Sequence, residues 1–314
     1  GLSRDKDLIK ASYEISLSQG LGSGSSSFIT GLRPVHKLLE TELSEWLNRE
    51  KVILFPSGFQ ANIAAVQALA NRNSIVIADK LIHNSLLVGI KASQAKLIRF
   101  AHNDLKDLEN KILKFNSPQN SILIVVESLY SMEGSISPLR EITEICKKYN
   151  VELLVDEAHA IGILGPEGRG LSFSFSDCIT LVTGTFGKAF GSGGAFIACN
   201  AKFGEYLIQT SGAYRYTTAL SPALAAGALK ALQKIKKNKE WGAYLLESAQ
   251  MWKREMRKHF NYPVQGDAHI LSIIVGREEN AIHLQKYLEA NGFLAIAIRP
   301  PTVPVGKSRI RLTI

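Results

Sequence analysis

The sequence predicts an α/β fold with a mostly parallel sheet covered by helices on both faces, followed by a smaller C-terminal α+β domain. Short apolar, β-branched runs lie between polar or glycine-rich breaks, and they are continuous in the way expected of parallel strands buried on both faces. Amphipathic stretches such as residues 138–149 separate them, as right-handed βαβ crossovers require. The runs are SIVIAD, KLIRF, SILIVVES, VELLVDEAH, ITLVTGTF and GGAFIAC.

Helical periodicity marks the stretches before, between and after these strands. Residues 34–47 carry apolar side chains at helical spacing, with Pro34 in the first turn, where a proline is tolerated. A second helix is expected through residues 61–70, and a long amphipathic helix from about Ser221 to roughly Lys258. The remaining expected elements are ILSIIVG, a helix near residues 281–291, and SRIRLTI.

These elements suggest a large domain over residues 1–235 and a small one over residues 236–314. The sequence opens abruptly on GLSRDKDL and stops on an apolar strand, so we expect both domains to be truncated.

Composition is that of an ordinary globular protein: 314 residues, 46% hydrophobic and 21% charged. The longest apolar runs, such as residues 122–126, are far shorter than the roughly 20 residues that a membrane helix needs. A cytoplasmic enzyme is the simplest interpretation. Three widely spaced cysteines, Cys146, Cys178 and Cys199, argue against a disulfide framework, and we expect all three to be buried.

The net charge of +9 favours anionic partners such as phosphate esters, coenzyme A or an acidic carrier protein. Nucleic acid stays open on charge alone. However, the basic residues cluster in KALQKIKKNKEW and MWKREMRKHF, where periodic apolar residues indicate the solvated faces of helices.

One lysine, Lys188, lies among glycines and hydroxyl residues just after a predicted strand, in TGTFGKAFGSGG. A lysine that attacks an aldehyde needs a restricted, partly desolvated site that keeps its amine neutral. Gly184, Gly187, Gly191 and Gly193 would let the backbone turn tightly near a bulky cofactor. Taken alone, the segment is equally typical of any glycine-rich loop.

VELLVDEAHAIG releases Asp156 and His159 at the end of an apolar strand, where open parallel sheets bind ligands. A carboxylate there is costly to bury unless it meets a cation, and a protonated pyridine nitrogen is such a cation. The structural alternative is an Asp that caps the next helix and a His that fills space. No P-loop accompanies the segment.

Three further segments suggest contacts to an anion or a ring. FPSGFQAN places Ser57 and Gly58 at a helix start, suited to a phosphate or to a plain helix cap. GLGSGSSSFITG is either a functional loop or a connection. His83 follows a strand, and a lone histidine is more often structural.

Together and in this order, these segments resemble the α-oxoamine synthases, fold-type I pyridoxal-phosphate (PLP) enzymes. The resemblance runs from GLGSGSSSFITG through FPSGFQAN, DKLIHNSLL, ESLYSMEG, VDEAHAIG and TGTFGKAFG to IRPPTVPVGKSRIRLT. It implies the PLP transferase fold, a homodimer, and a condensation of an amino acid with an acyl thioester that releases carbon dioxide.

The resemblance assigns four residues to the ring of the cofactor. Lys188 is similar to the lysine that holds PLP as a Schiff base and later acts as the base. Asp156 resembles the partner of the pyridine nitrogen, and His159 the donor to the phenolic oxygen. His83 resembles the imidazole stacked on the ring face, which also touches the substrate.

For the phosphate, the resemblance points to Gly58, Phe59 and Thr185, and it places Thr217 and Thr218 at the phosphate of the neighbouring subunit. Glu127 and Ser131 resemble residues that line the cofactor.

Contacts to the substrate are implied for Arg299 or Arg311, which would hold its carboxylate, and for Thr302. Bidentate geometry favours arginine in that role, although a solvent-facing Arg311 is the alternative. Ser25 and Ser27 depart from the family pattern of a glycine and a basic residue, which puts carrier contacts of that loop in doubt.

The segment IRPPTVPVGKSRIRLT most resembles the member of the family that joins L-alanine to a pimeloyl thioester in biotin biosynthesis. Members that use other amino acids and acyl groups, an aminotransferase of the same fold, and a non-catalytic partner subunit are the alternatives. Coenzyme A and an acyl-carrier protein both suit the positive charge. No metal and no membrane partner is expected.

Overall fold

The structure, a computed structural model, describes residues 1–259 and 262–314. It divides into two compact units: residues 1–128 with 137–239 form the first, and residues 129–136 with 240–314 form the second. The division after Lys239 lies close to the expected boundary after residue 235, but the sequence did not indicate that residues 129–136 belong with the second unit.

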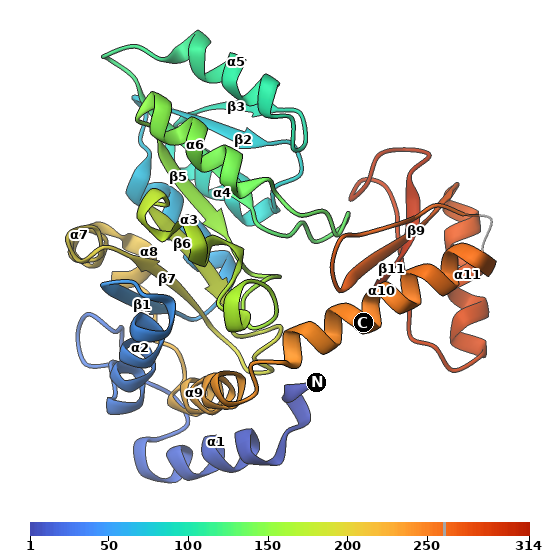
Figure 1. Cartoon of the computed structure of the whole chain (residues 1–314). Coiled ribbons are helices and arrows are strands. Elements are labelled where there is room, and N and C mark those ends of the chain that lie inside the picture. The colour runs from blue at the N-terminus through green and yellow to red at the C-terminus, as the bar shows by residue number, and fades with distance from the viewer. Residues whose placement is uncertain (260–261) are drawn as a thin grey trace. The chain divides into compact units, whose positions relative to one another are not determined.

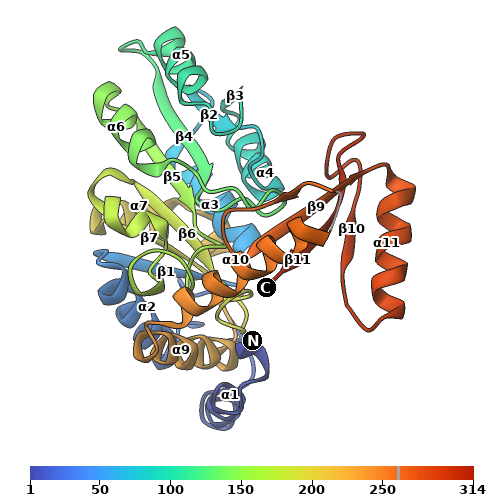
Figure 2. The same cartoon turned by 45° about the vertical axis from the view of Figure 1, so that its right-hand side comes forward.

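The first unit contains a seven-stranded sheet and its covering helices (Figures 1 and 2). Its strands are β1 Lys51–Phe55, β2 Ser74–Asp79, β3 Lys96–Phe100, β4 Ser121–Glu127, β5 Glu152–Asp156, β6 Leu181–Thr185 and β7 Ala195–Cys199. Its helices are α1 Lys6–Gln19, α2 Pro34–Leu47, α3 Gly58–Leu69, α4 Asn84–Ser93, α5 Leu105–Phe115, α6 Leu139–Tyr149, α7 Ala201–Thr210, α8 Gly212–Arg215 and α9 Pro222–Lys237, with short 3₁₀ turns at Leu2–Arg4, Pro166–Gly168 and Leu171–Cys178.

The strand order is β1-β7-β6-β5-β4-β2-β3. Neighbouring strands run parallel from β6 to β3, and only β7 runs antiparallel to both of its neighbours. The expected mostly parallel sheet is therefore confirmed. The sequence reading missed β1, whose run KVILF is too short to be distinguished from the end of the preceding helix.

Alternation along the strands sorts their side chains between the two faces of the sheet. Ile124 and Val126 of β4 join Leu153 and Val155 of β5 in one core with α2, α5, α6 and α9. The side chains between them point to the other face, where α3 packs against β5, β6 and β7. Helices thus cover both faces, and the last residues of β4 and β5 face α3.

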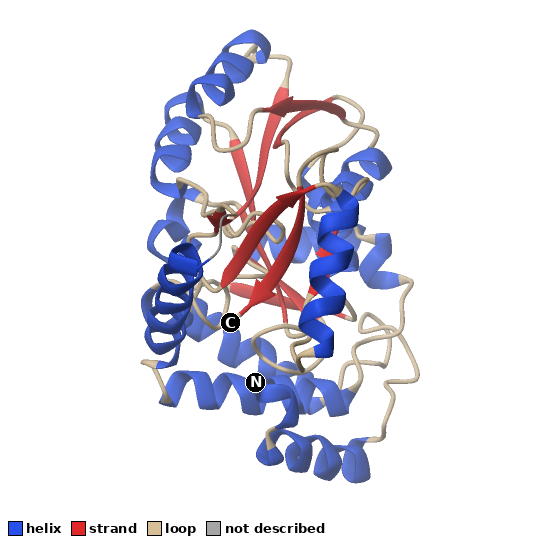
Figure 3. Cartoon of the chain, turned by 90° about the vertical axis from the view of Figure 1, so that its right-hand side faces the viewer, coloured by secondary structure: helices blue, strands red, loops and turns tan. Residues whose placement is uncertain are grey.

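The second unit holds an antiparallel sheet in the order β10-β11-β9-β8. Its elements are α10 Trp241–His259, β8 Val264–Gln265, β9 Ile270–Gly276, α11 Glu278–Ala290, β10 Ile296–Ile298 and β11 Ser308–Thr313, drawn as blue helices and red strands in Figure 3. The expected single long helix from residue 221 is two helices, α9 and α10, which residues 238–240 separate.

A hairpin, residues 129–136, carries the chain from β4 into the second unit. Ser272 Oγ and Arg309 Nη1 both donate hydrogen bonds to Met132 O, at 2.8 and 3.2 Å. The backbone N–H of Asp267 donates to Gly134 O at 2.7 Å. The hairpin is therefore fixed within that unit by β9 and β11 and by the loop that precedes β9.

Within residues 1–259 and 262–314, none of the helices combines the length and the apolar character needed to cross a bilayer.

We predict that Gly184→Ala destabilises the first unit. A Cβ at this strand position would lie 2.4 Å from Cζ of the Phe196 ring on β7, so the core must shift. Overpacking of this kind costs about 1–3 kcal/mol, measurable as a lower urea midpoint. Gly22→Ala, where a Cβ meets no atom of the described chain within 4 Å, is the control and should leave the midpoint unchanged.

Candidate active site

A pocket of about 230 Å³ opens where parallel strands of the first unit end. Glu127 ends β4, Asp156 ends β5, and Thr185 ends β6. Glu127 pairs in register with Asp156, and Asp156 with Thr183, so their side chains point to the same face of the sheet, toward α3. The pocket is lined by Gly58, Phe59, Asn62, His83, Ser85, Glu127, Asp156, Ala158, His159, Thr183, Gly184, Thr185 and Lys188.

Asn62 on α3 is the centre of the polar network at the bottom of this pocket. Its Nδ2 donates to Asp156 Oδ2 at 2.7 Å and to Ser85 Oγ at 2.9 Å. Its Oδ1 accepts from Thr183 Oγ1 at 2.7 Å. All four side chains are buried, so each hydrogen bond satisfies a group that water does not reach.

Asp156 accepts a second hydrogen bond, from the backbone N–H of Ala158 to Oδ1 at 2.8 Å. Both oxygens of this buried carboxyl group are therefore paired with donors, which stabilises the anion. The residues after β5 form a turn and not a helix, so Asp156 caps a turn instead of the helix that the sequence allowed. Its role toward a cation in the pocket stays a prediction.

Lys188 and His159 lie together at the exposed side of the pocket. Lys188 Nζ is 2.8 Å from His159 Nε2. At this distance the two nitrogens form a hydrogen bond, and which of them donates depends on the tautomer of His159.

His83 precedes α4 and caps it, because its Nδ1 accepts from the backbone N–H of Ser85 at 3.2 Å. The same Nδ1 lies 2.7 Å from Ser85 Oγ, which connects His83 to Asn62. Burial lowers the pKa of His83; Asp156 opposes this effect and the charge of Lys188 adds to it. A neutral imidazole at the pocket wall follows.

The start of α3 forms the opposite end of the pocket from Asp156. Ser57 caps the helix by accepting from the Gln60 N–H, at 3.3 Å, so its side chain has the plain capping role that the sequence allowed. A Cβ on Gly58 would lie 3.5 Å from the Thr185 side chain. Backbone N–H groups at a helix start, together with a threonine hydroxyl, favour an anion.

The sequence analysis missed Asn62, Ser85 and Thr183. FPSGFQAN and DKLIHNSLL contain the first two, but only the packing of α3 on the sheet brings them to Asp156. A polar residue on the apolar face of α3, four residues after Gly58, was the available signal.

Six of the residues expected at the site do not line this pocket. Thr217 and Thr218 lie in the first unit, before α9; Thr217 is half-buried and Thr218 exposed. The other four belong to the second unit. There Arg311 Nε donates to Ser131 O at 2.7 Å, while Arg299 and Thr302 are exposed and joined by a backbone hydrogen bond of 3.0 Å.

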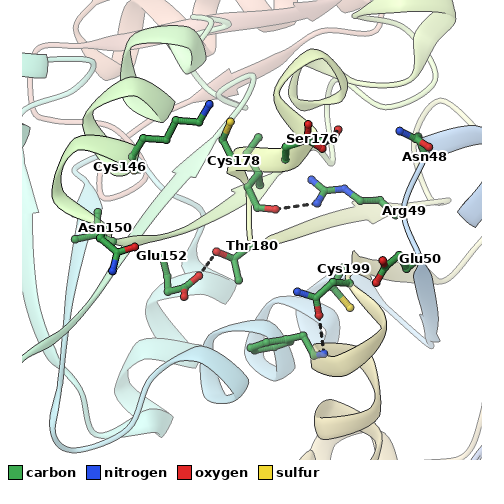
Figure 4. A pocket seen from close by; sticks show the side chains of 16 residues that line it. Asn48, Arg49, Glu50, Cys146, Asn150, Glu152, Ser176, Cys178, Thr180 and Cys199 are labelled. Carbon is green, nitrogen blue, oxygen red and sulfur yellow. Dashed lines mark hydrogen bonds between the residues drawn. The ribbon is translucent and has the colours of Figure 1, made fainter.

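A larger cavity, of about 530 Å³, opens at the other end of the parallel strands, beside the first residue of β5 (Figure 4). All three cysteines line it, and Cys178 is half-buried instead of buried as expected. Burial raises the pKa of both the Cys146 and the Cys199 thiol to about 12, so neither is a nucleophile. Across the described ranges no cluster of His, Cys, Asp and Glu side chains is arranged to hold a metal ion. The smaller pocket is therefore the candidate active site.

Comparison with known proteins identifies the family of the chain. The sequence profile described as "Aminotransferase class I and II" matches residues 3–314. The chain belongs to this family. The 8-amino-7-oxononanoate synthase of Marinomonas sp. is 36% identical, over 100% of this chain and 78% of that protein.

Two solved structures have the same fold. Serine palmitoyltransferase from S. paucimobilis with bound PLP superposes with a TM-score of 0.95 at 29% identity, covering 100% of this chain and 80% of that one. The 8-amino-7-oxononanoate synthase of Francisella tularensis gives a TM-score of 0.85 at 31% identity, covering 100% and 88%. The chain is thus a PLP-dependent transferase of fold type I and of the α-oxoamine synthase type, as the resemblance implied.

The pocket fits PLP on its own residues. Lys188 would supply a primary amine for the aldehyde, Asp156 an anion for the ring nitrogen, and the start of α3 with Thr185 a place for the phosphate. Asn62 contacts Asp156 and lies four residues after Gly58, so these two ends are separated by about 6 Å along α3.

We predict that Asn62→Ala weakens both the fold and cofactor retention. The change leaves Thr183 and Asp156 buried with fewer partners, at a cost of about 1–3 kcal/mol in the free energy of unfolding. Urea unfolding and the PLP content after dialysis measure the two effects. Gln67→Ala, on the exposed side of α3, is the matched control; equal behaviour of the two variants would contradict a central role for Asn62.

Proposed function

We propose that this protein condenses L-alanine with pimeloyl-CoA or pimeloyl-carrier protein to form 8-amino-7-oxononanoate, the biotin-pathway reaction. The observation that carries a PLP-dependent reaction is the convergence of Lys188, His159 and Asp156 in one pocket. The substrate assignment is supported by curated relatives of that name, such as the one from Marinomonas sp..

When bound, PLP supplies an electron sink for negative charge that develops at the α-carbon of the amino acid. Asp156 maintains that capacity: its carboxylate, held by Asn62 and by the Ala158 N–H, keeps a proton on the ring nitrogen. A shift of one unit in the pKa of the ring nitrogen corresponds to about 1.4 kcal/mol of free-energy difference between its protonated and neutral forms.

Lys188 has two roles in this proposal. Its amine would hold the cofactor, and when free of the cofactor it would be placed to remove the proton from the α-carbon of the amino acid as a general base. His159 Nε2, 2.8 Å from Lys188 Nζ, is placed to take up a proton from the lysine and to donate to the phenolic oxygen of the ring. His83, kept neutral by burial, would lie against the ring face.

Residues outside the pocket complete the proposed site. Arg311 or Arg299 would hold the carboxylate of the substrate by bidentate hydrogen bonds, with Thr302 nearby. Arg311 Nε donates to the carbonyl oxygen of Ser131 within the second unit. In a homodimer, Thr217 and Thr218 would reach the phosphate of the neighbouring subunit.

Several alternatives use the same cofactor chemistry. Serine palmitoyltransferase is favoured by the TM-score of 0.95, and 2-amino-3-ketobutyrate ligase and 5-aminolevulinate synthase differ only in the amino acid and the acyl group. An aminotransferase of this fold would also need Lys188 and Asp156. A non-catalytic partner subunit is disfavoured, because the chain retains Lys188 together with Asp156, His159 and His83.

We expect Lys188→Ala to abolish covalent attachment of PLP. Reduction of the wild-type protein with borohydride should fix the cofactor on the peptide that contains Lys188, as read by mass spectrometry, and the visible absorbance band should vanish in the variant. Lys202→Ala, an exposed lysine of α7, is the control. Label on another lysine, or on none, would refute the cofactor site.

A thiol-release assay measures which amino acid the enzyme prefers. With pimeloyl-CoA or pimeloyl-carrier protein as acyl donor, L-alanine should give a higher kcat/KM than glycine or L-serine. Turnover with glycine alone, or with L-serine and a long-chain acyl-CoA alone, would replace the proposed substrates by those of the corresponding relatives.

A further inference from the structure

Two buried carboxyl groups lie side by side at the bottom of the pocket. Glu127 and Asp156 are register partners on the adjacent parallel strands β4 and β5, and only 2% and 5% of their surfaces are exposed. Strands in a sheet are about 4.8 Å apart, so the two acids are close neighbours on the same face. Two anions at this separation, away from water, repel each other strongly.

The two carboxyl groups differ in their hydrogen-bond partners. Asp156 accepts hydrogen bonds on both oxygens, from Asn62 and Ala158. Glu127 Oε1 is buried and, among the described residues, no donor or acceptor lies within hydrogen-bonding distance of it. The two environments therefore favour opposite charge states, with the anion on Asp156 and the proton on Glu127.

Burial and the neighbouring Asp156 raise the pKa of Glu127 well above its ordinary value, in agreement with the geometry. A backbone hydrogen bond from His83 opposes this effect, and so does the charge of Lys188. Neither removes the penalty of placing a second anion beside Asp156 in a buried site.

We propose that Glu127 stays a protonated, neutral acid in the working enzyme and thereby leaves Asp156 as the single anion at the bottom of the pocket. Glu127 acts through Asp156 and is a positioning residue: it keeps the negative charge on the one carboxylate that Asn62 holds in place. Its unpaired Oε1 lines the pocket and is available to an acceptor atom of a bound molecule. The importance of this charge state for catalysis rests on the proposed function, but the charge state itself does not.

Infrared difference spectra test the protonation directly. The spectrum of the purified wild-type protein minus that of Glu127→Gln at pH 7 should contain the carbonyl band of a carboxylic acid and no carboxylate band. Glu45→Gln, an exposed glutamate of α2, should give the carboxylate band instead. A carboxylate band for Glu127 would overturn the proposal.

The pH dependence of unfolding provides a second, independent readout. Since the folded state holds the proton more tightly than the unfolded state, Glu127 contributes stability that is present below its ordinary pKa of 4.5 and is lost as the pH rises toward the folded value. Glutamine carries no such proton. The unfolding temperature of Glu127→Gln should therefore rise relative to wild type as the pH increases above 4.5, and a constant difference would overturn the proposal.

Neither measurement depends on turnover. A missing acid band with intact PLP binding and thiol release would refute the role of Glu127 alone. Absence of PLP labelling at Lys188 would refute the proposed function while leaving the charge state of Glu127 as measured.

Discussion

The buried carboxylate of Asp156 is the constraint on which the rest of the site depends. An anion at the end of an apolar strand is stable only with donors on its oxygens or a cation in front of it. The chain provides the donors from two directions, the Asn62 side chain on α3 and the Ala158 N–H of its own loop. In the proposed function, the face of the anion toward the pocket would meet the cation, the protonated ring nitrogen of PLP. The same constraint is the reason for the proposed neutral state of Glu127. A second negative charge on the neighbouring strand would repel the Asp156 carboxylate.

Helix α3 would fix both ends of the proposed cofactor site. Its first residue, Gly58, presents backbone N–H groups for an anion, and Asn62, about one turn later, holds Asp156. The distance between the phosphate end and the ring-nitrogen end is thereby set by the pitch of one helix and does not depend on loop conformation. Asn62 also connects to His83 through Ser85, so the side chains proposed for the ring nitrogen and for the ring face share one buried network.

The sequence predicted those features that depend on residues close together in the chain. Apolar runs predicted strands β2 to β7, and the residue types at strand ends predicted Asp156, His159 and Lys188 as candidates. The network of Asn62, Ser85 and Thr183 could not be predicted, because it depends on sheet register and on how α3 packs. Gly184 was interpreted as conformational freedom near a cofactor, yet it lies in β6 and leaves room for the Phe196 ring. The hairpin of residues 129–136 gave no local signal either, since its partners Ser272 and Arg309 are distant in sequence.

The residues on either side of that hairpin explain a third buried acid, Glu157. The chain leaves the first unit at Ser128, one residue after Glu127, and returns at Ser137. Four hydrogen bonds hold this point. The backbone N–H of Ser128 donates to Asp156 O at 2.9 Å, and its Oγ donates to Glu157 Oε2 at 2.6 Å. The Ser137 N–H donates to Ser128 O at 3.0 Å, and its Oγ donates to Glu127 O at 2.7 Å.

Glu157 is fully buried and also accepts from the Ser172 N–H, which anchors it to the following loop. The acids at the ends of β4 and β5 are thus fixed by hydrogen bonds where the chain leaves and re-enters the first unit.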